Sequence, residues 1–283
     1  MIVIAFAGPN GSGKSTLISS LEKYPHFPGN FVSPDEIAKT EELMKIVNYD
    51  KRSQAAADIA TELRYLLLNE NEDFAFESVF SHPSKLEFLK EAKALGYTIE
   101  SIFVTTKDPQ MNIDRVAHRV ANGGHDVPVD KIRPRYERSL ALLPELIEIS
   151  DYNRVYDNSD ESPFIVFRKH QEIHVLLNKE KRYEWVDEKL INPLKEMNII
   201  DHNVTDLSVE ETEEFNMRLD FTYYYDKYVN DCFRLPYDFV KSVMDRTFEK
   251  REELTYDEIV EEFDAYDRAQ ESVQHEDSWD IER

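Results

Sequence analysis

Short apolar runs alternate with longer amphipathic stretches through the first two thirds of the chain. The apolar runs predict strands at Ile2–Ala7, Phe31–Ser33, Phe74–Glu77, Thr98–Thr105 and Arg154–Tyr156. Strands that alternate with helical patterns are typical of a parallel sheet covered by helices on both faces. The pattern therefore predicts a three-layer α/β fold.

Residues that favour helix ends mark the helices between these strands. The first helix is expected over Ser15–Glu22, and another is expected to be capped by Ser84 and to stop before Gly96. A third is expected to open at Asp108-Pro109 and to end at Gly123-Gly124, because proline suits a first turn and glycine suits a left-handed exit.

The chain changes character after the last predicted parallel strand. Phe164–Arg168 and Ile173–Leu177 predict a hairpin, followed by a helix over Arg182–Met197. Beyond that helix only helical signals continue: capping boxes at Ser208–Glu211 and Thr255–Glu258, with Pro236 placed to start another helix. We therefore divide the chain into an α/β domain, 1–198, and an acidic helical region, 199–283.

Charge separates these two parts as well. The formal net charge is −23, and residues 201–283 hold 9 Lys and Arg against 25 Asp and Glu, a net of −16. Such acidity disfavours nucleic acid as a partner, because a phosphate backbone would be repelled over most of the surface. Two interpretations of the acidic region stay open: a solvated helical bundle that covers one edge of the first domain, or a segment that regulates that domain in cis.

Neither composition nor hydropathy favours export or a membrane. The apolar run after Met1 is too short for a signal peptide, and no run reaches the ~20 residues that span a bilayer. A single cysteine, Cys232, excludes an internal disulfide and fits a reducing compartment. We expect a cytoplasmic globular protein.

A glycine-rich turn follows the first strand and has the spacing G-x-x-x-x-G-K-[ST]. Its residues are Gly8, Pro9, Asn10, Gly11, Ser12, Gly13, Lys14, Ser15 and Thr16. Between a strand and a helix, this motif binds nucleoside triphosphates: backbone N–H groups and Lys14 hold the phosphates, and the Ser15 hydroxyl can ligate Mg²⁺. The sequence therefore predicts an ATP or GTP site with Mg²⁺.

Arginines surround the glycine pair at 123–124. Arg115 and Arg119 are four residues apart and share one helix face, and beyond the glycines come Arg133, Arg135 and Arg138. A phosphoryl group in transfer calls for several convergent cations, which a lid of two such helices supplies. The alternative is that these arginines pair with surface acids such as Asp126 and Glu137.

Acidic residues follow two predicted strands at the edge where ligands bind in such sheets. Asp35 can orient and deprotonate a substrate hydroxyl, although it can also be a helix cap, and its neighbour Glu36 is expected only to stabilise the helix dipole. Glu77, with Ser78 beside it, can bind a second hydroxyl or hold Mg²⁺ through water. These residues predict a hydroxyl acceptor opposite the phosphates.

Taken together, these motifs resemble the zeta-toxin-like family of P-loop kinases. The resemblance covers roughly residues 1–160 and is carried by GPNGSGKS, SPDEIA, FAFESVFS, RVAHRVANGGHDVP, IRPRYERS and VYDNS. It implies a fold like that of adenylate kinase and transfer of the γ-phosphate of ATP or GTP to a small hydroxyl acceptor, with UDP-N-acetylglucosamine the best-known one. It also implies an antitoxin as a partner.

The resemblance also implies roles for single residues. Lys14 and Ser15 would hold phosphates and Mg²⁺, Asp35 would be the general base, and Arg115 and Arg119, with Arg135 of the predicted lid, would act on the transferring group. Glu77 and Ser78 would bind the acceptor, and Asp157 and Asn158 would lie near the nucleotide base.

Two departures from the family pattern stand out. Ser33 stands where relatives have Asn, and Pro134 interrupts a basic helical stretch, which requires that helix to begin near Arg133. Between Asp35 and Phe74 no motif identifies the acceptor.

Two other functions compete with a small-molecule kinase. A transporter-type or repair-type ATPase shares the glycine-rich turn, but the strand ending in Asp-Glu and the Ser-Gly-Gly signature helix are missing. A polynucleotide kinase would need a basic channel, which the overall acidity disfavours.

Overall fold

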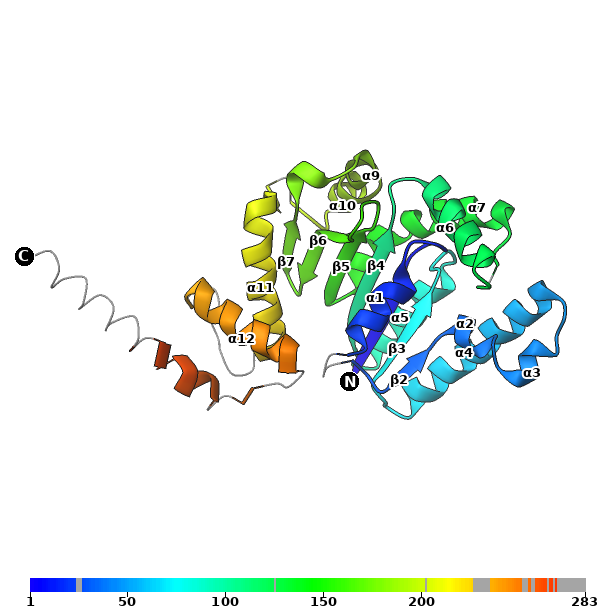
Figure 1. Cartoon of the computed structure of the whole chain (residues 1–283), viewed down its shortest axis with the longest axis horizontal. Helices are drawn as coiled ribbons and strands as arrows, with labels where there is room; N and C mark the ends of the chain where they lie inside the picture. The colour runs from blue at the N-terminus through cyan, green and yellow to red at the C-terminus, as the bar shows by residue number, and fades with distance from the viewer. Residues whose placement is uncertain are drawn as a thin grey trace, which may run out of the picture. The chain divides into compact units, whose positions relative to one another are not determined.

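The computed structural model describes residues 1–23, 27–124, 126–201, 203–225, 235–250, 254–255, 258–263, 265–266 and 268. They form two compact units (Figure 1): one comprises Met1–Glu22 and Phe27–Val209, and the other includes the described residues from Glu210 onward. Within the described residues, no helix is both long enough and apolar enough to span a bilayer. Cys232 lies outside these residues.

An eight-stranded sheet, in the order β2-β3-β1-β4-β5-β6-β7-β8, forms the centre of the first unit. Its five parallel strands are β1 (Ile2–Ala7), β2 (Asn30–Val32), β3 (Phe74–Ser78), β4 (Thr98–Thr105) and β5 (Tyr152–Asp157). The predicted hairpin then adds β6 (Phe164–His170), which is antiparallel to β5, and β7 (Ile173–Leu176), which is antiparallel to β6. β8 (Thr205–Asp206) pairs parallel with β7. The predicted parallel sheet is therefore the larger part of a mixed one.

Both faces of the sheet are buried, which explains the continuous apolar sequence of its strands. On β1, Ile4 and Phe6 share a core with Ile18 of α1 (Lys14–Leu21). Val3, Ala5 and Ala7 belong to a larger core with α5 (Ser84–Ala94), α7 (Val129–Ala141) and α8 (Leu143–Ile149). The result is the predicted three-layer arrangement.

Three helices separate β2 from β3; the first carries Asp35 of the SPDEIA motif, and the other two lie in the segment without a motif. They are α2 (Pro34–Ile37), α3 (Glu41–Met44) and the long α4 (Tyr49–Asn69). Residues of α4 pack in the larger core, including Ala60 and Leu68. Figure 1 shows α2, α3 and α4 together beyond the β2 edge of the sheet.

Two predicted helix ends can be compared directly with the structure. Asp108 caps α6 (Pro109–Ala121), because its carboxylate accepts the N–H of the second helical residue at 2.7 Å. The prediction that Ser84 caps α5 is wrong: Ser84 is the first helical residue, and its N–H donates to the His82 ring at 3.2 Å.

Pro134 lies inside a helix, so the expectation that this helix begins near Arg133 is wrong. α7 starts at Val129, and buried Ile132 and Tyr136 hold it against the core on either side of the proline. Pro134 removes only the donor to the carbonyl of exposed Asp130, which water can replace.

The predicted helix over Arg182–Met197 is broken into shorter pieces. After the short 3-10 turn at Lys179–Lys181 come α9 (Glu184–Val186), a π-helical turn at Asp187–Ile191 and α10 (Asn192–Glu196). The N–H of Asn192 donates to the Asp187 carbonyl five residues earlier, and Pro193 has no N–H to continue the regular ladder.

The second unit has a core of its own. α11 (Val209–Tyr225) begins directly after Ser208, and α12 (Tyr237–Lys250) begins directly after Pro236, as the sequence predicted. Phe221, Tyr225, Phe239, Val240, Val243, Met244 and Ile259 form the buried cluster. The capping box at Thr255 and Glu258 forms reciprocally, with bonds of 2.7 and 3.4 Å.

Candidate active site

The glycine-rich turn lies between β1 and α1, and its glycines are required by backbone geometry. Gly13 has φ 99°, and a Cβ there would come within 2.2 Å of the Asn158 side chain. At Gly8, with φ 138°, a Cβ would lie 2.0 Å from the Val104 carbonyl oxygen. The turn is therefore held against the ends of β4 and β5, and any side chain at these positions would displace it.

Lys14 is 5% exposed and lies at the floor of the site. Its Nζ donates to the carbonyl oxygens of Gly8 at 2.9 Å and Pro9 at 3.0 Å, and it lies 3.7 Å from Oε1 of Glu77. Burial lowers the pKa of Lys14, although the charges of Glu77 and Asp35 act in the opposite direction. This buried cation lies where the phosphate-binding motif requires one.

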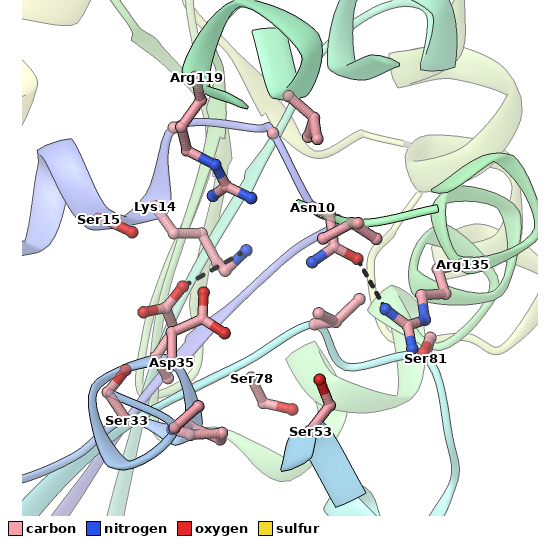
Figure 2. A pocket seen from close by; sticks show the side chains of 18 of the residues that line it. Asn10, Lys14, Ser15, Ser33, Asp35, Ser53, Ser78, Ser81, Arg119 and Arg135 are labelled. Atoms are coloured by element: carbon pink, nitrogen blue, oxygen red, sulfur yellow. Dashed lines mark hydrogen bonds and ion pairs between the residues drawn. The ribbon is translucent and has the colours of Figure 1, made fainter. Parts of the chain in front are cut away.

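A cavity of about 510 Å³ opens over the turn. It is lined by most of the residues that the sequence assigned to the site: Asn10, Gly11, Gly13, Lys14, Ser15, Thr16, Asp35, Glu77, Ser78, Arg115, Arg119, Arg135 and Asn158. Segments far apart in the chain thus converge on one space, as Figure 2 shows for those it labels.

Two carboxylates face Lys14 from the carboxyl ends of β2 and β3. Asp35 is in the first turn of α2, but the capping role falls to Ser33, whose hydroxyl accepts the Glu36 N–H at 3.4 Å. Asp35 is therefore not the cap, and it lines the cavity. Burial, with a further contribution from the charge of Asp35, raises the pKa of Glu77, while Lys14 opposes this shift.

The lid arginines come from α6 and α7. Arg115 donates to the Asn158 carbonyl at 2.7 Å, and Arg135 donates to the Asn10 side chain at 3.3 Å. Arg119 extends toward Lys14 from the side opposite Asp35 (Figure 2). Its buried Nε and Nη2 have no hydrogen-bond partner among the described residues.

The alternative of surface ion pairs does not hold for these arginines. Within the part of the chain that the structure describes, no acid forms an ion pair with Arg115, Arg119 or Arg135, and Glu137 pairs with Lys189 instead. Arg133 and Arg138 lie outside the cavity lining, donating to Gln110 and to the Ser81 carbonyl.

Some assigned residues lie beside the cavity rather than in it. Gly8, Pro9 and Ser12 belong to the turn but do not line the cavity. The carbonyl oxygens of Gly8 and Pro9 accept hydrogen bonds from Lys14. Asp157 is fully buried, and its two oxygens accept the Ser159 N–H at 2.7 Å and the Trp185 indole N–H at 2.6 Å. His125, which belongs to the motif RVAHRVANGGHDVP, lies outside the described residues.

The structure adds residues that the motifs did not identify. Asn112 is fully buried and donates to the Asn10 carbonyl at 2.7 Å, tying α6 to the turn. The segment without a motif contributes Ser53 and Arg64 of α4, and α5 contributes Lys85. Arg64 could have been identified from the sequence, because it is a charged residue within an otherwise apolar stripe of α4.

The sequence comparison agrees with this site. A sequence model described as Zeta toxin matches residues 2–166. The chain belongs to the zeta toxin family. This match contains the glycine-rich turn, both carboxylates and the arginines of α6 and α7, so every charged residue assigned to the site lies inside the family region.

Three proteins that resemble this zeta toxin family member share 15–28% sequence identity with it. An uncharacterized protein of Haemophilus influenzae is 28% identical over 138 residues, covering 47% of this chain and 91% of that protein. The AvrRxo1-ORF1:-ORF2 complex has a chain with TM-score 0.53 and 15% identity, covering 66% of this chain and 63% of that one. A structure of the PezAT chromosomal toxin-antitoxin system of Streptococcus pneumoniae gives TM-score 0.45, 16% identity, and coverage of 69% and 77%. At 15% identity, the likeness to the AvrRxo1-ORF1:-ORF2 chain bears on the α/β fold alone.

Proposed function

We propose that this protein is an ATP-dependent kinase that phosphorylates a hydroxyl of a small acceptor. The proposal depends on one observation: Asp35 and Arg119 approach Lys14 from opposite sides (Figure 2). A base, a phosphate-binding cation and a transition-state cation around one cavity are what phosphoryl transfer to an alcohol needs.

Each residue then has a distinct role in the reaction. The backbone of the turn and Lys14 hold the β- and γ-phosphates of ATP or GTP, and Asn158 lies beside the loop that binds them. Asp35 orients the acceptor hydroxyl and takes its proton as the oxygen attacks. Arg119, with Arg115 and Arg135, stabilises the negative charge that develops on the phosphoryl oxygens.

The site also fits Mg²⁺. No group of three His, Cys, Asp or Glu side chains suited to a metal occurs among the described residues. Mg²⁺ in nucleotide sites is held by one or two protein oxygens together with phosphates and water, and the Ser15 hydroxyl in the cavity lining provides one such oxygen. When bound, Mg²⁺ neutralises phosphate charge. Glu77, whose Oε1 lies 3.7 Å from Lys14, can hold the water ligands of Mg²⁺ or bind the acceptor.

For the acceptor we propose UDP-N-acetylglucosamine or a related nucleotide sugar, on the family motifs that surround Asp35 and Glu77. A polynucleotide kinase or a simple ATPase is the alternative. Incubation with labelled ATP and either nucleotide sugars or an oligonucleotide distinguishes them, because label on the oligonucleotide alone contradicts our choice.

Substitution of the base tests the reaction itself. Asp35→Asn should leave the Kd for ATP unchanged and lower kcat by about 10²- to 10⁴-fold, since only proton transfer is lost. Glu36→Gln is the matched control, because Glu36 is adjacent but exposed and outside the main cavity lining. Full turnover in Asp35→Asn rejects the assignment.

Regulation of the activity is a separate proposal. Either an antitoxin protein or the acidic residues 201–283 restrain the enzyme, because an acidic surface attracts the arginine-rich lid. Comparison of turnover and cell growth for the full chain and a chain ending at 200 tests regulation in cis. Equal turnover and equal toxicity exclude it.

A further inference from the structure

A buried arginine interrupts the apolar stripe of α4. Positions 56, 60, 64 and 68 lie four residues apart on one helix face, and their exposed fractions are 1%, 0%, 2% and 2%. Three of them are the apolar residues Ala56, Ala60 and Leu68, whereas the fourth is Arg64. Arginine is almost never fully buried unless it is paired.

The contacts of Arg64 leave its charge uncompensated within the protein. Its Nη2 donates to the Thr61 hydroxyl at 2.9 Å, and the guanidinium carbon lies 5.1 Å from the ring centre of Phe76 and 5.5 Å from that of Phe88. Its buried Nε has no hydrogen-bond partner, and no acid pairs with it, among the described residues. The two rings hold the guanidinium plane in place while its remaining donors lack an anion.

A second cation lines the same cavity, near enough to Arg64 for the two charges to interact. This cation is Lys85 of α5, and Ser53 and Ser81 also line the cavity. Burial, and secondarily the charge of Arg64, lowers the pKa of Lys85 to about 8. Two cations that disfavour one another are kept together without an acid from the described chain, which costs stability and indicates a ligand role.

The phosphates of ATP do not account for this pair. The turn, Lys14 and Ser15 come from the β1–α1 connection, and the transferring group is covered by α6 and α7, whereas Arg64 and Lys85 come from α4 and α5. The remaining space in the cavity belongs to the acceptor. The part of the cavity lining that would contact the acceptor therefore carries two cations.

We propose that Arg64 and Lys85 form an oxyanion subsite, and that the acceptor carries a phosphate or carboxylate group in addition to its reactive hydroxyl. The subsite deepens, and rests on, the proposed kinase function. The planar fork of Arg64 suits two oxygens of such a group, and Lys85 adds a point charge. Neutral alcohols lack the group that these two cations bind.

Calorimetric titration of the full chain tests the subsite without any phosphoryl transfer. The protein is first saturated with ADP and Mg²⁺ and then titrated with inorganic phosphate, and separately with malonate as a carboxylate source. Lys85→Met should weaken binding of at least one of these anions by about 10- to 100-fold, the value of one or two charge-assisted bonds. The anion that binds more tightly to the wild type shows which oxyanion the subsite prefers.

Matched variants separate this subsite from the lid. Arg119→Met should retain the Lys85-dependent binding, and Arg64→Met should lose it while keeping side-chain volume between the rings. If Arg64→Met does not fold, Lys85→Met alone decides. Wild-type anion binding in Lys85→Met, or anion binding that disappears only in Arg119→Met, overturns the proposal. Because no turnover is involved, this result is independent of the Asp35→Asn assay that tests the kinase function.

Discussion

Replacement of Arg119 by methionine should make the nucleotide-free protein more stable and the enzyme far less active. Two of its buried donors, Nε and Nη2, have no partner among the described residues. An unsatisfied buried polar group costs about 1–3 kcal/mol, and because Arg119 is itself half-buried we use the lower end of that range. Methionine keeps the aliphatic contact and removes the unsatisfied groups.

The expected gain is about 1–2 kcal/mol in the free energy of unfolding, or a rise in Tm of about 2–8 °C for a chain of this size. If Arg119 acts on the transferring phosphoryl group as proposed, its loss should lower kcat by about 10³-fold. Opposite changes in stability and activity are what a residue kept for catalysis should show.

Calorimetry without nucleotide and a turnover assay with labelled ATP measure the two effects. Arg133→Met is the matched control, since Arg133 is on α7, donates to Gln110 and lies outside the cavity lining. It should change neither Tm nor kcat appreciably. The reasoning is refuted if Arg119→Met melts at a lower temperature than the wild type and turns over at the wild-type rate.

Three further predictions follow from other contacts. Gly124→Ala should lower both kcat and Tm, because an added Cβ would lie 2.6 Å from Cγ and 2.9 Å from the carbonyl oxygen of Arg119 and would displace both the side chain and the end of α6; steady-state kinetics and a melting curve check this. Binding of sulfate to the ADP-bound protein should weaken as pH rises through about 8, since Lys85 is charged below its lowered pKa of about 8 and neutral above it; a pH series in which Lys85→Met shows the same decline would contradict this. Asp157→Ala should lower the free energy of unfolding by about 2–4 kcal/mol, because Trp185 and a backbone N–H lose their acceptor, while the Kd for ATP is kept; urea titration and nucleotide binding measure the two.

The sequence predicts best those parts of the site that are contiguous. The turn at residues 8–16 is fixed by local steric rules and by the strand before it, so its chemistry can be read directly. The arginines of α6 share a face by helical spacing alone. The direction of that face, toward Lys14, follows only from the packing of Val116, Ile132 and neighbouring residues, and no local pattern specifies it.

Other features depended on tertiary context that no motif records. Pro134 was judged by its local cost, but the burial of Ile132 and Tyr136 outweighs one missing hydrogen bond. Asp157 follows a strand as a ligand-binding acid would, yet Trp185, 28 residues later, takes its oxygen. Arg64 was detectable as a charge within an apolar stripe, but its neighbour in the cavity comes from a different helix.

The attachment of α6 to the phosphate-binding turn limits how the two can move. Asn112, in the first turn of α6, donates to the Asn10 carbonyl, and a side chain at Gly11 would come within 2.5 Å of the Asn112 carbonyl oxygen. The first turn of α6 is therefore fixed to the glycine-rich turn. Arg135 of α7 also donates a hydrogen bond to the Asn10 side chain. Any movement of the turn should therefore also move α6 and α7, so that the positions of the arginines on these helices are coupled to the position of the turn.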